Sequence, residues 1–64
     1  MLEAYTFSYL DAEGKTLDAT NADCADDEDA IERAVRWRLP NSAIVEIWCG
    51  ARVVAKRRLD NPEQ

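Results

Sequence analysis

The sequence predicts an α+β fold: a two-layer sandwich in the order ββαββ, with one helix packed on one face of a four-stranded, mainly antiparallel sheet. Residues 26–39 combine the apolar spacing and the charge distribution of an amphipathic helix. The stretches on either side alternate in hydrophobicity around a glycine, as β-hairpins do. With 64 residues the chain makes one domain with a small core. We place this domain at residues 1–58 and expect a flexible tail at 59–64.

The first hairpin is expected over residues 4–20. Aromatic side chains alternate with hydroxyl side chains over residues 5–9, which is the period of a strand with one buried face. A three-residue loop at residues 12–14, with Gly14 in the left-handed conformation, would pair Tyr9 with Leu17. This register places the apolar pairs on one face and the polar pairs on the other.

The helix has start and stop signals. Asp26 can cap the first turn, three further acids follow it, and Pro40 is expected to end the helix after Leu39. The apolar positions recur every three or four residues, so they form one buried stripe. The stripe contains Ile31, Ala34, Val35 and Leu39, flanked by Ala30 and Trp37.

The second hairpin is expected over residues 43–57, with a three-residue loop at 48–50 that ends in Gly50. This loop pairs Glu46 with Arg52, so an acid meets a base. A two-residue turn at residues 49–50 is the alternative, and it would break that match.

The longer loop also decides which valine of the last strand is buried. It pairs Val45 with Val53 on the helix side of the sheet and Ile44 with Val54 on the opposite side. Val53 exposed to water and Val54 beneath the helix would therefore contradict this loop.

A right-handed helical crossover between the hairpins suggests the strand order 2-1-4-3, with the first and last strands parallel and central. Cys24 and Cys49 would then lie near opposite edges, too far apart for a disulfide. We expect two free thiols in a reducing compartment.

Charge is divided unevenly along the chain, whose net charge is −5. Acids outnumber bases ten to one up to residue 32, and bases outnumber acids seven to three from residue 33. An acidic chain is a poor partner for nucleic acid, because phosphate neutralisation supplies most of that affinity. A segregated basic face would be needed, and its candidates are Arg52, Lys56, Arg57 and Arg58.

The residues needed for common catalytic and metal sites are scarce. The chain has no histidine, and its glycines, Gly14 and Gly50, are both required by hairpins. The acids of residues 26–29 lack the spacing of a calcium loop. We therefore expect no enzymatic activity, no metal, no cofactor and no small-molecule ligand.

The chain shows no export or membrane signal. No apolar run approaches the length that crosses a bilayer, and the N-terminus lacks the basic start and apolar stretch of a signal peptide. We expect a small acidic protein in the cytoplasm that does not associate with membranes.

An interaction surface is expected on the sheet face away from the helix. Apolar and aromatic side chains on an open sheet face often mark an interface. Alternatively, the tryptophan of the second hairpin folds back as a lid over the core. The candidate surface contains Ile44, Trp48, Arg52, Val54 and Lys56.

The chain resembles a group of short uncharacterised bacterial proteins, common in alphaproteobacteria, that run as hairpin, helix, hairpin. The matching stretches are YTFSYLDAEGK, DDEDAIERA and VEIWCGARVVAK, within residues 5–57. The resemblance implies this fold and a bacterial origin, and it implies no activity. The chain is also similar to small antitoxins of bacterial toxin–antitoxin pairs, in its aromatic strand, glycine turn and acidic helix start.

Three functional hypotheses follow. The leading one is a non-enzymatic interaction module that binds a protein partner or forms a homodimer through the open sheet face or an edge strand. The second is a nucleic-acid-associated or toxin–antitoxin-type regulator that uses the C-terminal basic strand. The third is a thiol-based redox role for Cys24 and Cys49.

Overall fold

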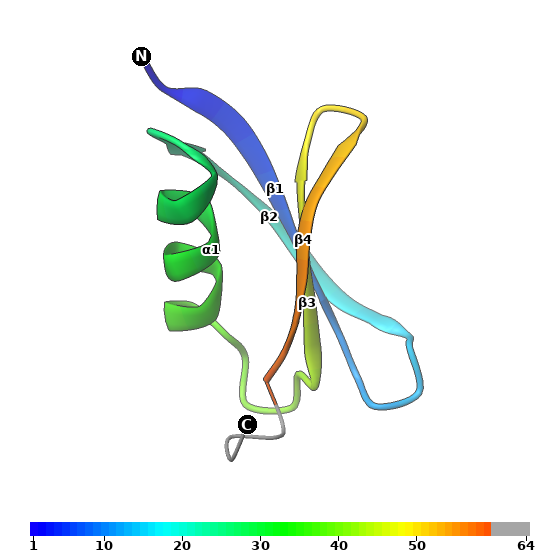
Figure 1. Ribbon diagram of the computed structural model, residues 1–64. Helices are drawn as coiled ribbons and strands as arrows, with labels where there is room; N and C mark the ends of the chain where they lie inside the picture. Colours follow the sequence, from blue (N-terminus) through cyan, green and yellow to red (C-terminus); the bar gives the residue numbers. More distant parts are fainter. Residues whose placement is uncertain (60–64) are drawn as a thin grey trace.

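The computed structural model describes residues 1–59 and confirms the α+β architecture. In those residues one helix lies against one face of a four-stranded sheet (Figure 1). The element order is ββαββ, as the alternating and helical stretches of the sequence predict. The elements are β1 (Glu3–Leu10), β2 (Thr16–Cys24), α1 (Asp27–Arg36), β3 (Ile44–Cys49) and β4 (Arg52–Arg58).

The strand order is β2-β1-β3-β4, and every neighbouring pair is antiparallel. The expected order 2-1-4-3, with parallel first and last strands, is therefore wrong. β1 and β3 supply the buried aromatic and branched side chains and lie in the centre, whereas the polar β2 and the basic β4 lie at the edges. Charged strands suit edges because they discourage pairing with other chains.

The first hairpin has the predicted loop and a different register beyond it. Gly14 adopts a φ of 86°, and the Asp11 amide donates to the Lys15 carbonyl across the loop at 2.9 Å. A bulge between Tyr9 and Leu10 then shifts the pairing by one residue, so Tyr9 lies opposite Asp18. The predicted pairing of Tyr9 with Leu17 is wrong, and Leu17 is exposed.

The bulge determines which residues of β2 face the helix. Tyr5 lies opposite Ala22, and Glu3 lies opposite Cys24. Cys24 consequently enters the core with no exposed surface. A regular strand after the loop would have placed these positions on the other face.

The second hairpin has a two-residue turn, not the predicted three-residue loop. Cys49 pairs with Arg52 across Gly50 and Ala51. The alternative of a two-residue turn at residues 49–50 therefore had the right length, but the turn lies one residue later. Gly50 has a φ of 64° while Ala51 does not have a positive φ. This is the pattern of a type II′ turn, which requires glycine at its first central position.

The shorter turn reverses the predicted orientation of the two valines in β4, and a second bulge follows at Val54. Trp48 pairs with Val53 and Ile47 pairs with Ala55, so Val54 is the extra residue. Val53 is 54% exposed, whereas Val54 is half-buried and packs against the core. The prediction that Val53 is buried and Val54 faces outward is wrong, because the two-residue turn pairs Val53 with Trp48 and so shifts the alternation of β4 by one position. The bulge at Val54 then returns Ala55 and Lys56 to their predicted faces.

The helix starts as predicted and ends earlier. The Asp26 carboxylate accepts a hydrogen bond from the Asp29 amide at 2.8 Å, which confirms the N-cap. The last helical residue is Arg36, and Trp37 caps the C-terminus, so the end predicted at Leu39 is three residues too late. The Tyr9 hydroxyl donates a 2.7 Å hydrogen bond to the Ala34 carbonyl, which is one of the acceptors that a helix end leaves without an intrahelical partner.

The core lies between the helix and the centre of the sheet. Small residues of the helix allow it to approach closely, because Ala30 and Ala34 are fully buried while Ile31 and Val35 are only half-buried. Trp37 is 44% exposed and contacts Phe7 edge-on at 6.0 Å between ring centroids. The fully buried side chains of the sheet and its flanks are Tyr5, Phe7, Tyr9, Cys24, Val45 and Ile47.

The chain remains packed one residue past the predicted domain boundary. Leu59 packs against the core, and its amide donates to the Ala43 carbonyl at 2.7 Å. The remainder of the predicted tail, residues 60–64, lies outside the described residues.

Candidate interaction surface

The outer face is the side of the sheet opposite the helix, and no element of residues 1–59 covers it (Figure 1). Its residues alternate along the strands with those of the core. The cross-strand pairs arrange them in rows across the sheet. We define the outer face by the side chains Thr6, Ser8, Leu10, Ala19, Asn21, Asp23, Ile44, Glu46, Trp48, Val53, Lys56 and Arg58.

Three of the five predicted surface residues lie on this face. Ile44, Trp48 and Lys56 occupy alternate positions to the buried Val45 and Ile47 and their partners. The other two predicted residues lie on the helix side: Val54 packs against the core, and Arg52 forms an ion pair with Asp27 of α1. The two-residue turn places Arg52 and Val54 on the helix side, and the bulge at Val54 returns Lys56 to the outer face.

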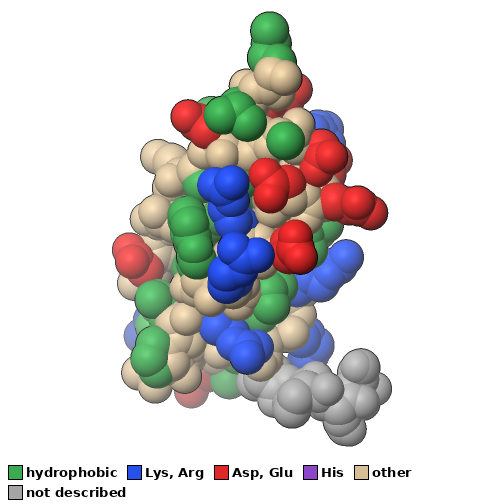
Figure 2. Space-filling model, turned by 90° about the vertical axis from the view of Figure 1, so that its left-hand side faces the viewer, with side chains coloured by type: hydrophobic (Ala, Val, Ile, Leu, Met, Phe, Trp, Pro, Cys, Tyr) green, Lys and Arg blue, Asp and Glu red, His purple; other side chains and the backbone are tan. Residues whose placement is uncertain are grey.

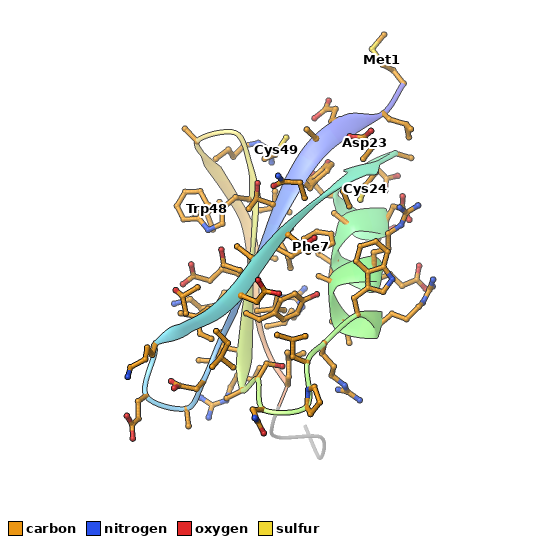
Figure 3. All side chains as sticks on the ribbon, turned by 180° about the vertical axis from the view of Figure 1, so that it is seen from behind. Met1, Phe7, Asp23, Cys24, Trp48 and Cys49 are labelled. Carbon is orange, nitrogen blue, oxygen red and sulfur yellow. The ribbon has the colours of Figure 1, made fainter. Side chains whose placement is uncertain are left out.

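Trp48 belongs to the outer face and does not form a lid over the core. Figure 3 shows its ring on the side of the sheet away from the helix, whereas Phe7 lies between sheet and helix. The indole N–H donates to the Glu46 carboxylate at 3.3 Å, so the ring lies along β3. Val53 is its cross-strand partner. The alternative of a folded-back tryptophan is wrong.

A second apolar pair lies at the other end of the outer face. Leu10 of β1 pairs with Ile44 of β3, and both are half-buried. Between the two apolar ends, Lys56 forms a salt bridge with Glu46 at 3.6 Å. The predicted charge match of Glu46 is therefore made with Lys56 instead of Arg52.

Two large apolar side chains of the outer face, Leu10 and Val53, are absent from the predicted surface. Leu10 could have been found, because it continues the alternation of Thr6 and Ser8 along β1. Val53 was missed because its face depends on the length of the turn before it, and the predicted three-residue loop places it on the helix side.

The edges of the sheet are less suited to binding another strand. β4 contains four bases and no acid in seven residues and is bulged at Val54. β2 is bulged near Leu17 and carries Asp18 and Asp23. Bulges and charges are the features by which sheet edges avoid pairing with other strands.

On the helix side, Asp27 connects α1 to two strands. Its carboxylate accepts a 2.7 Å hydrogen bond from the Tyr5 hydroxyl and two longer ones, 3.2 and 3.4 Å, from the Arg52 guanidinium. The guanidinium and then the hydroxyl hold the pKa of the Asp27 carboxyl below its usual value. Hydrogen bonding to that carboxylate, with burial, raises the pKa of Tyr5 to about 12.

Both cysteines are free, in agreement with the expectation. Cys24 lies on edge strand β2 and Cys49 on central strand β3, so the predicted placement of Cys49 near an edge is wrong. The Cys49 thiol donates to the Glu3 carboxylate at 3.3 Å, and this contact raises the pKa of the thiol. Burial raises the pKa of Cys24. Neither environment favours the thiolate, which is the reactive form.

The four basic residues of β4 do not form one continuous surface. Arg52 pairs with Asp27 on the helix side, and Lys56 pairs with Glu46 on the outer face. Arg57 lies opposite the buried Val45 and borders a shallow, open groove with Ile31 and the helix acids Glu28 and Glu32. Figure 2, which views the molecule from the helix side, shows acidic and basic side chains in adjoining groups.

Neither a metal centre nor a membrane span is present in the described part of the chain. Residues 1–59 contain no group of three or more carboxylate or thiol side chains placed to hold a metal ion. Within the same range, α1 is too short and too polar to cross a bilayer. A scan against protein-family models and searches of curated proteins and of solved structures found no match to this chain.

Proposed function

We propose that the protein is a small non-enzymatic interaction module that binds a protein partner through its outer face. The observation that carries the proposal is the placement of Trp48 and Val53 as a cross-strand pair on the uncovered side of the sheet. Aromatic residues are enriched at the centres of protein interfaces. The pair of Leu10 and Ile44 extends the apolar surface on the same face.

Binding through the face is supported over binding through an edge. The outer face offers a nearly neutral, partly apolar area, in which Glu46 and Lys56 neutralise each other. The edge strands β2 and β4 are bulged, and β4 is strongly basic. A strand added at either edge would meet a bulge, and a strand added at β4 would also meet its basic side chains.

The absence of catalysis is part of the same proposal. The groups most suited to acid–base chemistry, Tyr5 and Asp27, are hydrogen-bonded to each other, and Arg52 is paired with the same carboxylate. A cytoplasmic location suits the two free thiols, because reducing compartments keep cysteines unpaired.

Site-specific photo-crosslinking tests the proposed surface. We expect a photoreactive amino acid at Val53 to form adducts with a protein in vivo, and Trp48→Ala to abolish them. The matched control places the same group at Glu32, an exposed position on the helix. Equal adducts from both positions, or adducts from Glu32 alone, would rule out the outer face as the binding surface.

A further inference from the structure

The two halves of the outer face differ in side-chain size. The half formed by β3 and β4, here the large half, carries large side chains. The half formed by β1 and β2, here the small half, carries mainly small or short ones. The large side chains are Ile44, Trp48, Val53 and Lys56. The small ones are Thr6, Ser8, Ala19 and Asn21.

Strand register aligns these halves row by row. Trp48 and Val53 of one half continue into Thr6 and Asn21 of the other, because Thr6 pairs with Trp48 across the sheet centre. The Thr6 hydroxyl donates to the Asn21 side-chain carbonyl at 2.9 Å, so these two short side chains are held to each other across β1 and β2.

The second row follows the same division. Glu46 and Lys56 continue into Ser8 and Ala19. Large side chains therefore lie on one side of the β1–β3 boundary and small ones on the other, in both rows.

Resting on the proposed function, we propose that the partner of the outer face is a second copy of this chain. Two copies pack face to face about a two-fold axis that runs parallel to the strands above the β1–β3 boundary. The large half of each copy then lies on the small half of the other. Trp48 and Val53 of one copy cover Thr6 and Asn21 of the second, and the contact is self-complementary and closed.

The third row and the charges favour the same arrangement. Ile44 of one copy lies on Leu10 of the second, so the apolar ends meet. Among the charged groups of the outer face, Lys56 and Arg58 outnumber Glu46 on the large half, and Asp23 lies on the small half. The axis places a half of net positive charge over a half of net negative charge, with Asp23 in the row beyond Thr6 and not directly opposite Lys56 or Arg58.

The size of the molecule is compatible with such a dimer. Stable interfaces commonly take about 800 Å² from each partner, which is less than a fifth of the accessible surface of 4357 Å². Two sheets packed face to face form a core about 10 Å thick. A chain of this length buries a small core alone, so the second sheet adds apolar burial.

Sedimentation equilibrium of the full chain tests the proposal. We expect a monomer–dimer equilibrium, which Ala19→Arg weakens by about tenfold or more, because the new side chain meets Lys56 of the second copy. Ala19 is exposed, so the variant is expected to fold. Ala12→Arg, in the first hairpin loop, makes the same charge change away from the face and should leave the equilibrium unchanged. Ser8→Arg is a second variant on the outer face. It is expected to weaken the dimer in the same way and replaces Ala19→Arg if that variant does not fold.

Isotope-filtered NOE spectra of a mixed labelled and unlabelled sample test the orientation. We expect contacts from the Val53 methyl groups to the Asn21 side chain of the other copy, since β1 and β3 separate these residues within one chain. A dimer without these contacts would overturn the proposed arrangement.

Two further results would overturn the dimer. One is a chain that stays monomeric at about 1 mM. The other is a dimer that is as tight in Ala19→Arg as in Ala12→Arg. If Val53 then still forms adducts with a different protein in vivo, the proposed function stands and only the second copy fails as the partner. If neither the dimer nor outer-face adducts are found, both proposals fail.

Discussion

Asp27 is the residue that joins the most distant parts of the chain. Its carboxylate accepts from Tyr5 of β1 and from Arg52 of β4, and it lies in the first turn of α1. A negative charge at this position also interacts favourably with the helix dipole. Three elements therefore depend on one ionised group.

Acid should weaken the protein through Asp27. Its pKa is lower in the folded protein than the unfolded value of about 3.9. The stabilisation is therefore present above that value and is lost as the pH falls through the folded pKa. We expect Asp27→Asn to lower the melting temperature at neutral pH and to flatten its decline in acid. Glu28→Gln, in the same helical turn, should retain the decline. Equal acid profiles for the two variants would contradict this role of Asp27.

Tyr5 should ionise far above its ordinary pKa of about 10. The hydrogen bond to Asp27 is the main cause of the pKa of about 12. The stabilisation it reflects is complete below pH 10 and is lost as the pH rises towards about 12. An ultraviolet absorbance titration should show this transition, and Asp27→Asn should lower it. A Tyr5 transition that is unchanged in the variant would show that burial alone is responsible.

Single residues were predictable from sequence where the cause is local. Asp26 as N-cap and Gly14 in a left-handed loop follow from their neighbours alone. The partners of Asp27 were not predictable, because Tyr5 and Arg52 are more than 20 positions away and meet it only in the folded chain.

At the scale of elements, the N-cap should contribute measurably to helix stability. We expect Asp26→Ala to destabilise the protein by about 1 kcal/mol, which lowers the melting temperature of a domain this small by about 4–8 °C. Asp23→Ala removes the same charge three residues earlier, where the side chain makes no capping contact. Thermal unfolding that shifts equally in both variants would point to net charge instead of capping.

The two-residue turn before β4 leads to opposite predictions for two adjacent valines. Threonine has the shape of valine and suits a strand, so Val→Thr isolates the effect of burying a hydroxyl. We expect Val54→Thr to cost about 1 kcal/mol or more and Val53→Thr to change stability by less than about 0.5 kcal/mol. Chemical denaturation measures both, with each valine substitution placed in the Ala19→Arg variant so that no second copy covers Val53. A larger loss of stability from Val53→Thr than from Val54→Thr would contradict this orientation and support the one predicted from the sequence.

Elements were predictable to different extents. The helix start, both hairpins and the buried stripe of β1 follow from period and turn residues. The helix ends at Arg36 because the chain turns before Pro40, and no local signal marks that position. The two bulges were not predictable, because no local pattern in β2 or β4 marks the extra residue.

At the scale of the whole molecule, two layers leave one sheet face without a cover. The strand order places the apolar strands β1 and β3 in the centre and the polar strands at the edges. The basic composition of β4 is a sequence signal for an edge strand that the predicted order overlooked. The outer face follows from this arrangement, since one helix can cover only one side of the sheet.

The candidate surface was predictable only in part for the same reason. Ile44 lies on the predicted face because β3 is regular up to the turn, and Trp48 extends that strand instead of lying in the loop. Lys56 lies on the predicted face because the shorter turn and the bulge each reverse the face of β4 once, and the two changes cancel beyond Val54. Arg52 and Val54 were misassigned because the turn is one residue shorter than the predicted loop and begins at Gly50.

The central claim is that a second copy closes the outer face over Trp48. Trp37→Phe leaves Trp48 as the one tryptophan of the chain, so its fluorescence reports on that face alone. We expect the emission of Trp48 to move to longer wavelength as the protein is diluted, and the dependence on concentration to disappear in a variant that also carries Ala19→Arg. An emission that is unchanged across the dilution series, or that shifts equally with and without Ala19→Arg, would contradict the claim.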